Sequence, residues 1–152
     1  MPKNKEELQK SSDQILQGIR IVLPGTQAVI GFQFIAFFNP VFQSLSTQLK
    51  QLHFITLILS IVCSVLLIAP VAFQQLGEDG DPTPKFLSFT KKMLGAAMLL
   101  LLLAITGDIY VASQTINIEP VIAKFIAITL FILGLSLWYG YSFYRRSQKE
   151  KR

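Results

Sequence analysis

Four long apolar segments, each nearly free of charged side chains, alternate with polar connections along the chain. They span residues 21–42, 54–73, 93–115 and 121–144. Each has about the 20 residues that an α-helix needs to cross roughly 30 Å of hydrocarbon. A very apolar soluble bundle would need polar outer faces at helical spacing, and the run FITLILSIVCSVLLIA has none beyond Ser and Thr. The pattern therefore predicts an all-α integral membrane protein with four transmembrane helices in an antiparallel bundle.

The residues before the first segment are polar but carry one apolar stripe. Its members recur at spacings of seven, four and three residues: Leu8, Ile15, Ile19 and Val22. This spacing is typical of an amphipathic helix lying along the cytoplasmic interface, here over residues 1–23. At Pro24 the chain either bends from a surface helix into a spanning helix or begins a straight spanning helix in its first turn. Either way, Pro24 marks the entry into a four-helix transmembrane domain over residues 24–144.

Basic residues gather beside alternate ends of the four segments. Twelve of the fourteen Lys and Arg residues precede the first segment, lie between the second and third, or follow the fourth, which leaves Lys50 and Lys124 for the other side. Positively charged residues stay cytoplasmic, so we expect both termini, the middle loop and a basic tail over residues 145–152 to face the cytoplasm. An aromatic cluster beside that tail is typical of an interfacial belt and agrees with this orientation: Trp138, Tyr139, Tyr141 and Tyr144.

The net charge of +5 does not by itself indicate nucleic-acid binding. A basic cytoplasmic surface attracts anionic lipid headgroups, by about 1 kcal/mol for each residue near the membrane. We therefore expect membrane lipids, and not nucleic acid, as partners of this charge. The sequence also shows no glycine-rich phosphate loop and no zinc motif, and its single His and single Cys lie on different sides of the second segment. We expect a protein that is not an enzyme and that uses no cofactor or metal.

One carboxylate interrupts the third apolar segment. Asp108 lies sixteen residues beyond Lys92, which puts it about 24 Å along the helix axis from the cytoplasmic end and in the outer half of the membrane. A carboxylate at the centre of a membrane costs about 2.5 to 3.5 kcal/mol, so Asp108 should face protein rather than lipid. Small and polar residues on the same helical face would let another helix approach: Ala104, Ala112 and Thr115.

The sequence leaves the partner of Asp108 open. Lys124 stands at a matching depth in the next segment, so the two residues could form an ion pair. A protonated carboxyl hydrogen-bonded to Asn39 or Gln33 would equally fix the helix register. A functional interpretation also remains, because intramembrane acids often mark ion paths, and Asp108 could bind a proton or cation. His53 falls in the predicted outer connection, where we expect a polar cap rather than a metal ligand.

Two glutamines occupy the first segment. Gln27 and Gln33 are six residues apart, a rotation of about 240°, so they cannot share one helical face. One could bond across the bundle while the other serves an oligomer contact, and Gly31 beside them allows close approach of a second backbone.

Two short motifs resemble a family of small bacterial membrane proteins known only as a domain of unknown function. The first motif is QGIRIVLPGTQAVIGFQF, with Arg20, Gly25 and Gln27 in the family-like positions, and the second is LLIAPVAFQQL, which ends its apolar run at Ala69 and Pro70. The resemblance covers residues 17–115. A His-Arg pair that tends to follow the Ala-Pro element in that family is replaced here by Gln74 and Gln75. The resemblance implies a bacterial inner-membrane protein of about four helices and brings no established activity.

These observations favour a non-enzymatic structural or accessory membrane module that assembles with itself or stabilises a membrane protein partner. A four-helix bundle leaves little interior for a substrate path within one subunit. The alternative is a small oligomeric transporter or channel, linked to protons or cations, that uses Asp108.

Overall fold

The computed structural model describes residues 5–77 and 83–140. In these two ranges the chain forms helices and no strands. The elements are α1 (Lys5–Ala36), α2 (Pro40–Gln43), α3 (Thr47–Gly77), α4 (Pro84–Thr115), α5 (Pro120–Leu135) and the π-helical turn η1 (Ser136–Gly140). Four helices are long and apolar enough to cross a membrane: α1, α3, α4 and α5 with η1. The predicted basic tail 145–152 lies outside the described residues, as do Tyr141 and Tyr144.

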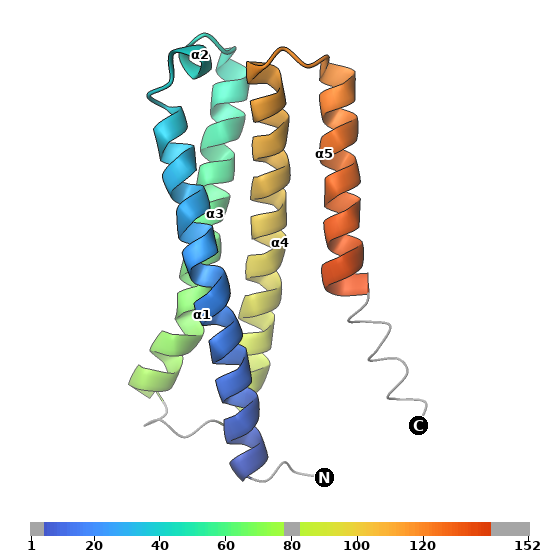
Figure 1. Cartoon of the computed structure of the whole chain (residues 1–152). Helices are drawn as coiled ribbons and strands as arrows, with labels where there is room; N and C mark the ends of the chain where they lie inside the picture. The colour runs from blue at the N-terminus through green and yellow to red at the C-terminus, as the bar shows by residue number, and fades with distance from the viewer. Residues whose placement is uncertain (1–4, 78–82, 141–152) are drawn as a thin grey trace.

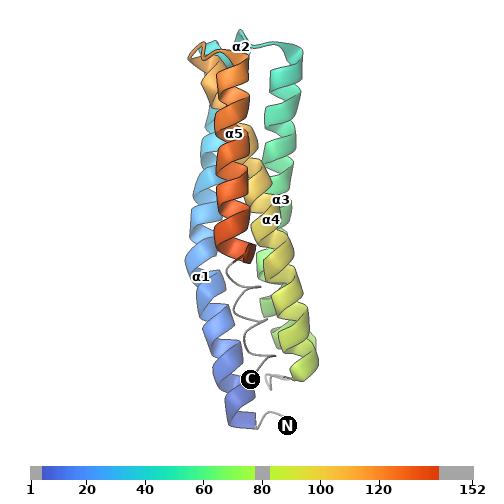
Figure 2. The same cartoon turned by 90° about the vertical axis from the view of Figure 1, so that its right-hand side faces the viewer.

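The four long helices run antiparallel to their neighbours in the chain (Figure 1). α3 and α4 lie side by side, α1 packs against both, and α5 packs on α4 (Figures 1 and 2). One end of the bundle holds α2 and the turn between α4 and α5, and the other holds the start of α1 and of α4. The predicted fold class, an all-α membrane bundle of four spanning helices, is confirmed.

The amphipathic segment and the first span belong to a single helix. α1 continues from Lys5 through Pro24 to Ala36, so the predicted division at residue 23 is not a break in the structure. The apolar stripe explains the continuity. Leu8 is buried against Phe86 and Leu87 of α4, and further along the stripe Ile19 packs in the central apolar cluster. Because the stripe finds apolar partners on α4, the first turns of α1 stay packed along the bundle.

Prolines set the starts of three helices. Pro40, Pro84 and Pro120 occupy the first turns of α2, α4 and α5, where the missing N–H has no helical partner to lose. The Asn39 side chain caps α2 by accepting a hydrogen bond from the Val41 N–H at 2.8 Å. This cap ends the first span at Ala36 and makes the predicted end at residue 42 part of a separate short helix.

α3 begins earlier and ends later than its predicted span of residues 54–73. It starts at Thr47 and ends at Gly77, with Pro70 inside the helix and buried. The seven added residues at the start, about two turns, carry His53 out of the predicted connection and into the bundle, where the residue is only 5% exposed. Because the first residues of α3 are mostly polar, the hydropathy pattern did not indicate that this part of the chain is helical.

Close helix contacts in the bundle use small residues. A Cβ atom on Gly107 of α4 would lie only 2.5 Å from Thr56 Cγ2 of α3, and a Cβ atom on Gly134 of α5 would meet Leu102 of α4. Small interfacial residues allow this approach of backbones in membranes. The outer face of α5 is apolar and exposed, with Phe125 at 72%, as expected for a surface that contacts lipid.

Candidate intramembrane polar site

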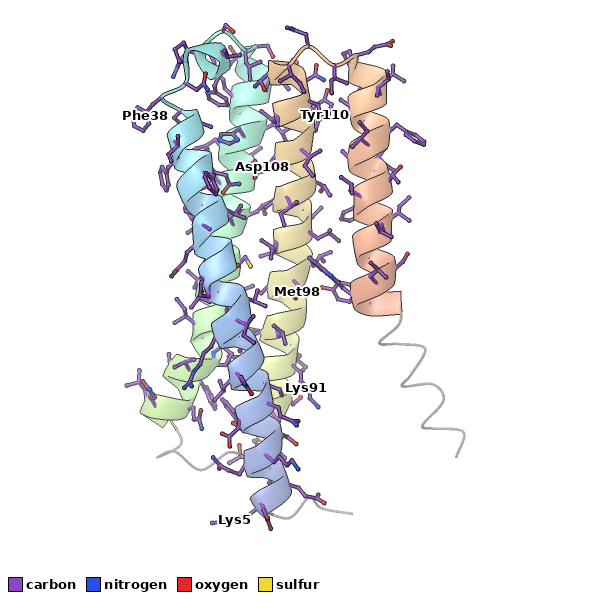
Figure 3. The ribbon with its side chains drawn as sticks, in the orientation of Figure 1. Lys5, Phe38, Lys91, Met98, Asp108 and Tyr110 are labelled. Carbon is purple, nitrogen blue, oxygen red and sulfur yellow. The ribbon has the colours of Figure 1, made fainter. Side chains whose placement is uncertain are left out.

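Asp108 lies where α1, α3 and α4 meet, nearer the end of the bundle that carries α2 (Figure 3). Its Oδ2 accepts a hydrogen bond from Gln33 Nε2 of α1 at 2.6 Å. Its Oδ1 contacts two groups of α3, Thr56 Oγ1 at 2.5 Å and His53 Nδ1 at 3.3 Å. We call Gln33, His53, Thr56 and Asp108 the polar cluster. It joins three of the four spanning helices through one carboxyl group.

The local sequence explains how α3 reaches Asp108. His53 and Thr56 are three residues apart and therefore lie on one face of α3. Gly107 precedes Asp108, and its missing side chain leaves room for Thr56. A larger residue at position 107 would hold α3 away from the carboxylate.

Two aromatic rings fix the plane of the His53 imidazole. Phe37 and Phe42 meet it edge to face, with centroid distances of 5.2 Å and 4.9 Å. Such aromatic contacts each contribute about 0.5 to 1.5 kcal/mol. His53 Nε2 lies 2.9 Å from the Gln33 main-chain oxygen, so both ring nitrogens have a partner.

The geometry at His53 and Asp108 accommodates one proton shared between the two side chains. A carbonyl oxygen only accepts, so Nε2 must donate its hydrogen to Gln33 O. A second hydrogen is then needed between Nδ1 and Oδ1, because two lone pairs facing each other at this distance would repel. Either the imidazolium donates to the carboxylate, or the carboxylic acid donates to the neutral ring. In both arrangements the pair holds one proton and has no net charge, so neither residue is an uncompensated buried charge.

The Thr56 hydroxyl is able to serve both arrangements. Its oxygen lies 2.8 Å from His53 O and 2.5 Å from Asp108 Oδ1, and it has one hydrogen for the two contacts. When the hydroxyl donates to Asp108 it stabilises the carboxylate. In the other arrangement the one acid hydrogen is donated to His53 Nδ1, and Oδ1 keeps a lone pair to which the hydroxyl can still donate.

A pocket of about 590 Å³ lies beside the polar cluster, between α1 and α4 near α2. Its wall is mainly apolar and includes Phe32, Phe42 and Ile109, with Asp108 and Gln33 among its polar members. The Asp108 side chain is 23% exposed. Gln33 Oε1 is buried and has no hydrogen-bond partner.

The structure brings together some of the predicted site residues and separates others. Gln33 bonds to Asp108, and Asn39 stands in the wall of the same pocket while its side chain caps α2. Lys124 does not pair with Asp108: in the described part of the chain, no ion pair joins them, and Lys124 lines a second pocket beside Gly107 and Tyr110.

The reason for this correction is the face of α4 that α5 covers. α5 contacts α4 at Leu102, where Gly134 approaches. Leu102 and Asp108 are six residues apart, so their side chains leave α4 about 120° from each other. Lys124 matches Asp108 in depth, but it lies beside a different face of α4, so the predicted ion pair does not form.

The sequence reasoning missed two members of the polar cluster, His53 and Thr56. The predicted start of the second span at residue 54 put His53 in a connection and left Thr56 as one polar residue among many. The available signal was their spacing of three residues at the depth of Asp108, since a polar face on α3 would match an acid on α4.

The residues of the family-like motifs lie away from the polar cluster. Arg20, Pro24, Gly25 and Gln27 are exposed on α1. A Cβ atom on Gly25 or Gly31 would have nothing within 4 Å, so neither glycine is required by a contact inside the bundle. Gln33 faces the interior and Gln27 the outside, as their 240° separation requires.

No metal centre is formed by the residues that the structure describes, since no three His, Cys, Asp or Glu side chains gather there. The model of a protein family described as "Family of unknown function (DUF6328)" matches residues 2–142. No curated protein and no solved structure matches the chain.

Proposed function

Because the chain belongs to DUF6328, a family of unknown function, we propose its role from the geometry: a non-enzymatic structural or accessory module of the bacterial inner membrane. In this proposal both termini face the cytoplasm, and the module assembles with itself or stabilises a membrane protein partner. The observation that carries it is the polar cluster, which draws Gln33, His53 and Asp108 from three different helices into mutual hydrogen bonds.

The polar cluster has the properties of a register-fixing contact. It satisfies the carboxylate oxygens of Asp108 from two neighbouring helices, so sliding of α1 or α3 along α4 would break those bonds. Hydrogen bonds between membrane helices average about 0.6 kcal/mol and reach about 1.7 kcal/mol. Three such bonds favour one arrangement of α1, α3 and α4 over shifted ones.

Exposed polar and small residues on the outside of the bundle support a contact with another chain. Gln27 and Gly31 are both exposed on α1, and small and amide-bearing residues are typical of contacts between membrane helices. Lys91 and Lys92 are exposed near the start of α4. In the proposed orientation they attract anionic headgroups of the cytoplasmic leaflet.

A second candidate function is a proton- or cation-linked transporter or channel. The observation that favours it is the contact of His53 Nδ1 with Asp108 Oδ1 at 3.3 Å beside a pocket of about 590 Å³. Intramembrane ionisable groups that face a cavity commonly belong to ion paths. Oligomer formation would be needed to build a continuous path from such small subunits.

One substitution separates the two candidates. Asp108→Asn replaces an acceptor oxygen by an amide group that faces Gln33 Nε2 or Thr56, so we expect a loss of about 1 to 3 kcal/mol of stability. The matched control is Glu119→Gln, which removes an exposed carboxylate at the same end of the bundle. Unfolding curves in detergent, oligomer mass and recovery of co-purifying proteins are compared for the three chains.

For a structural module, Asp108→Asn lowers stability and partner or oligomer recovery, while the wild-type chain gives no proton or cation flux in proteoliposomes. For a transporter, the wild-type chain gives flux that Asp108→Asn abolishes. Equal stability and equal recovery for Asp108→Asn and Glu119→Gln would contradict the structural role.

A further inference from the structure

We propose that the pocket beside Asp108 binds a small organic ammonium ion with an apolar body, and that binding releases the proton shared by His53 and Asp108. The proposal does not rest on the structural role, because a module that holds helices in register needs no ligand. It also does not require transport.

The pocket has the form of a site for a molecule with one polar end. Its volume of about 590 Å³ falls within the roughly 300 to 1,000 Å³ of small-molecule sites. Val29, Phe32 and Ile105 give it apolar walls, and Asp108 with His53 and Gln33 gives it a polar end. An apolar body would fill the walls while a single polar group reaches Asp108.

The polar end has an acceptor without a partner and no Lys or Arg side chain to supply a positive charge. Gln33 is only 3% exposed, yet its side-chain oxygen Oε1 has no hydrogen-bond partner. A buried acceptor without a donor is destabilising, so a ligand N–H beside it would be favourable. The exposed part of the Asp108 carboxyl faces the same pocket. No Lys or Arg is among the residues described as lining this pocket. The missing component is therefore a cationic donor.

A primary ammonium group matches the number of acceptors. It has three N–H donors, and three acceptors lie in the polar cluster: an Asp108 oxygen, the buried Gln33 Oε1 and, once its proton is gone, His53 Nδ1. His53 Nδ1 and Asp108 Oδ1 are 3.3 Å apart, so one nitrogen atom at an ordinary hydrogen-bond distance of about 2.9 Å can reach both.

Charge balance requires the loss of one proton. Before binding, His53 and Asp108 together hold one shared proton and have no net charge. After binding, the ammonium carries +1, the Asp108 carboxylate −1, and His53 is neutral with its remaining hydrogen still donated from Nε2 to Gln33 O. The hydrogen formerly between Nδ1 and Oδ1 leaves to solvent, since the ammonium occupies its place.

Other ionisable groups near this end of the bundle lie outside the lining of this pocket. Lys50 of α3 donates to Gln43 O at 2.6 Å. Lys124 and Tyr110 line the second pocket on another face of α4. Glu119 is exposed at the start of α5. Among the side chains described on α1, α3 and α4, His53 and Asp108 are the titratable groups that line the ammonium pocket.

The test measures binding of 4-phenylbutylammonium to the full chain in nanodiscs of phosphatidylcholine, whose quaternary headgroup has no N–H donor. Isothermal titration is repeated in buffers of different ionisation enthalpy, and 4-phenylbutanol serves as the neutral isostere. We expect saturable binding of the amine with one proton released per ligand, and at least tenfold weaker binding of the alcohol. The affinity for the amine should rise up to tenfold for each unit of increasing pH while His53 and Asp108 still hold their shared proton.

Three variants locate the site. Asp108→Asn should lose at least tenfold in affinity, while Glu119→Gln should bind as the wild type does. Ala112→Phe keeps the polar cluster and places a ring at an exposed position in the pocket wall, so it should lose binding without a change in thermal stability. This variant remains decisive if Asp108→Asn fails to fold.

Binding without proton release, equal binding of the alcohol, or full binding by Ala112→Phe would each overturn the proposal. A primary ammonium also occurs in phosphatidylethanolamine headgroups. Competition between this lipid and 4-phenylbutylammonium in mixed nanodiscs would assign the pocket to a lipid headgroup and overturn the free amine as its occupant.

Discussion

The closeness of α3 and α4 at the polar cluster is tested by Gly107→Ala. A Cβ atom at position 107 would lie 2.5 Å from Thr56 Cγ2, well inside ordinary van der Waals contact. Thr56 contacts Asp108 at 2.5 Å. The substitution should therefore push α3 outward and weaken the hydrogen bond on which the polar cluster depends.

Two opposing effects determine the size of the change. Replacing Gly by Ala inside a helix stabilises it by up to about 1 kcal/mol, whereas overpacking at a close contact costs about 1 to 3 kcal/mol. Gly95→Ala provides the control in the same helix, because nothing lies within 4 Å of a Cβ atom there. The helix gain is common to both variants, so Gly107→Ala should be less stable than Gly95→Ala by about 1 to 3 kcal/mol.

The measurement combines unfolding in mixed detergent micelles with ¹⁵N NMR of the imidazole. The chain contains one histidine, so a single set of ring signals reports on His53 and the polar cluster. We expect Gly107→Ala to shift these signals and Gly95→Ala to leave them unchanged. Equal stability of the two variants, with equal imidazole spectra, would refute the close approach of α3 and α4 at Gly107.

Three further predictions concern other parts of the bundle. Tyr139→Phe removes the hydrogen bond from the Tyr139 hydroxyl to Gly95 O at 2.5 Å, so it should destabilise by about 0.5 to 1.5 kcal/mol and speed hydrogen exchange in η1. Unchanged exchange there would contradict the contact. Cys63 is 1% exposed and should resist maleimide in mild detergent but react after unfolding in SDS; rapid labelling of the folded chain would show that its packing is looser. In a Cys63→Ala background, an impermeant maleimide added to intact cells should label Ser46→Cys and spare Lys85→Cys. The reverse pattern would overturn the proposed orientation.

Hydropathy was enough to predict the class of fold. Four apolar runs of sufficient length predict four spanning helices because unpaired backbone groups are costly in hydrocarbon, and a helix satisfies them within one segment. The same logic predicted that Asp108 turns away from lipid. Neither conclusion needs knowledge of which helix lies beside which.

The ends of the helices were harder to place. The start of α3 at Thr47 lies within a polar stretch, and its first turn is helical although no apolar run marks it. The end of the first span follows from the Asn39 cap and Pro40 rather than from hydropathy. Capping groups act through individual side chains, which an average over a segment does not register.

The sequence by itself determined that this protein crosses a membrane four times and that one acid within a spanning helix needs a polar partner inside the bundle. Only the tertiary structure decided that the partners are Gln33, His53 and Thr56 and not Lys124. Depth along a helix follows from counting residues, since each adds a fixed rise. Which face a neighbouring helix covers depends on packing among all the helices, here on the room that Gly107 gives to α3 and Gly134 gives to α4.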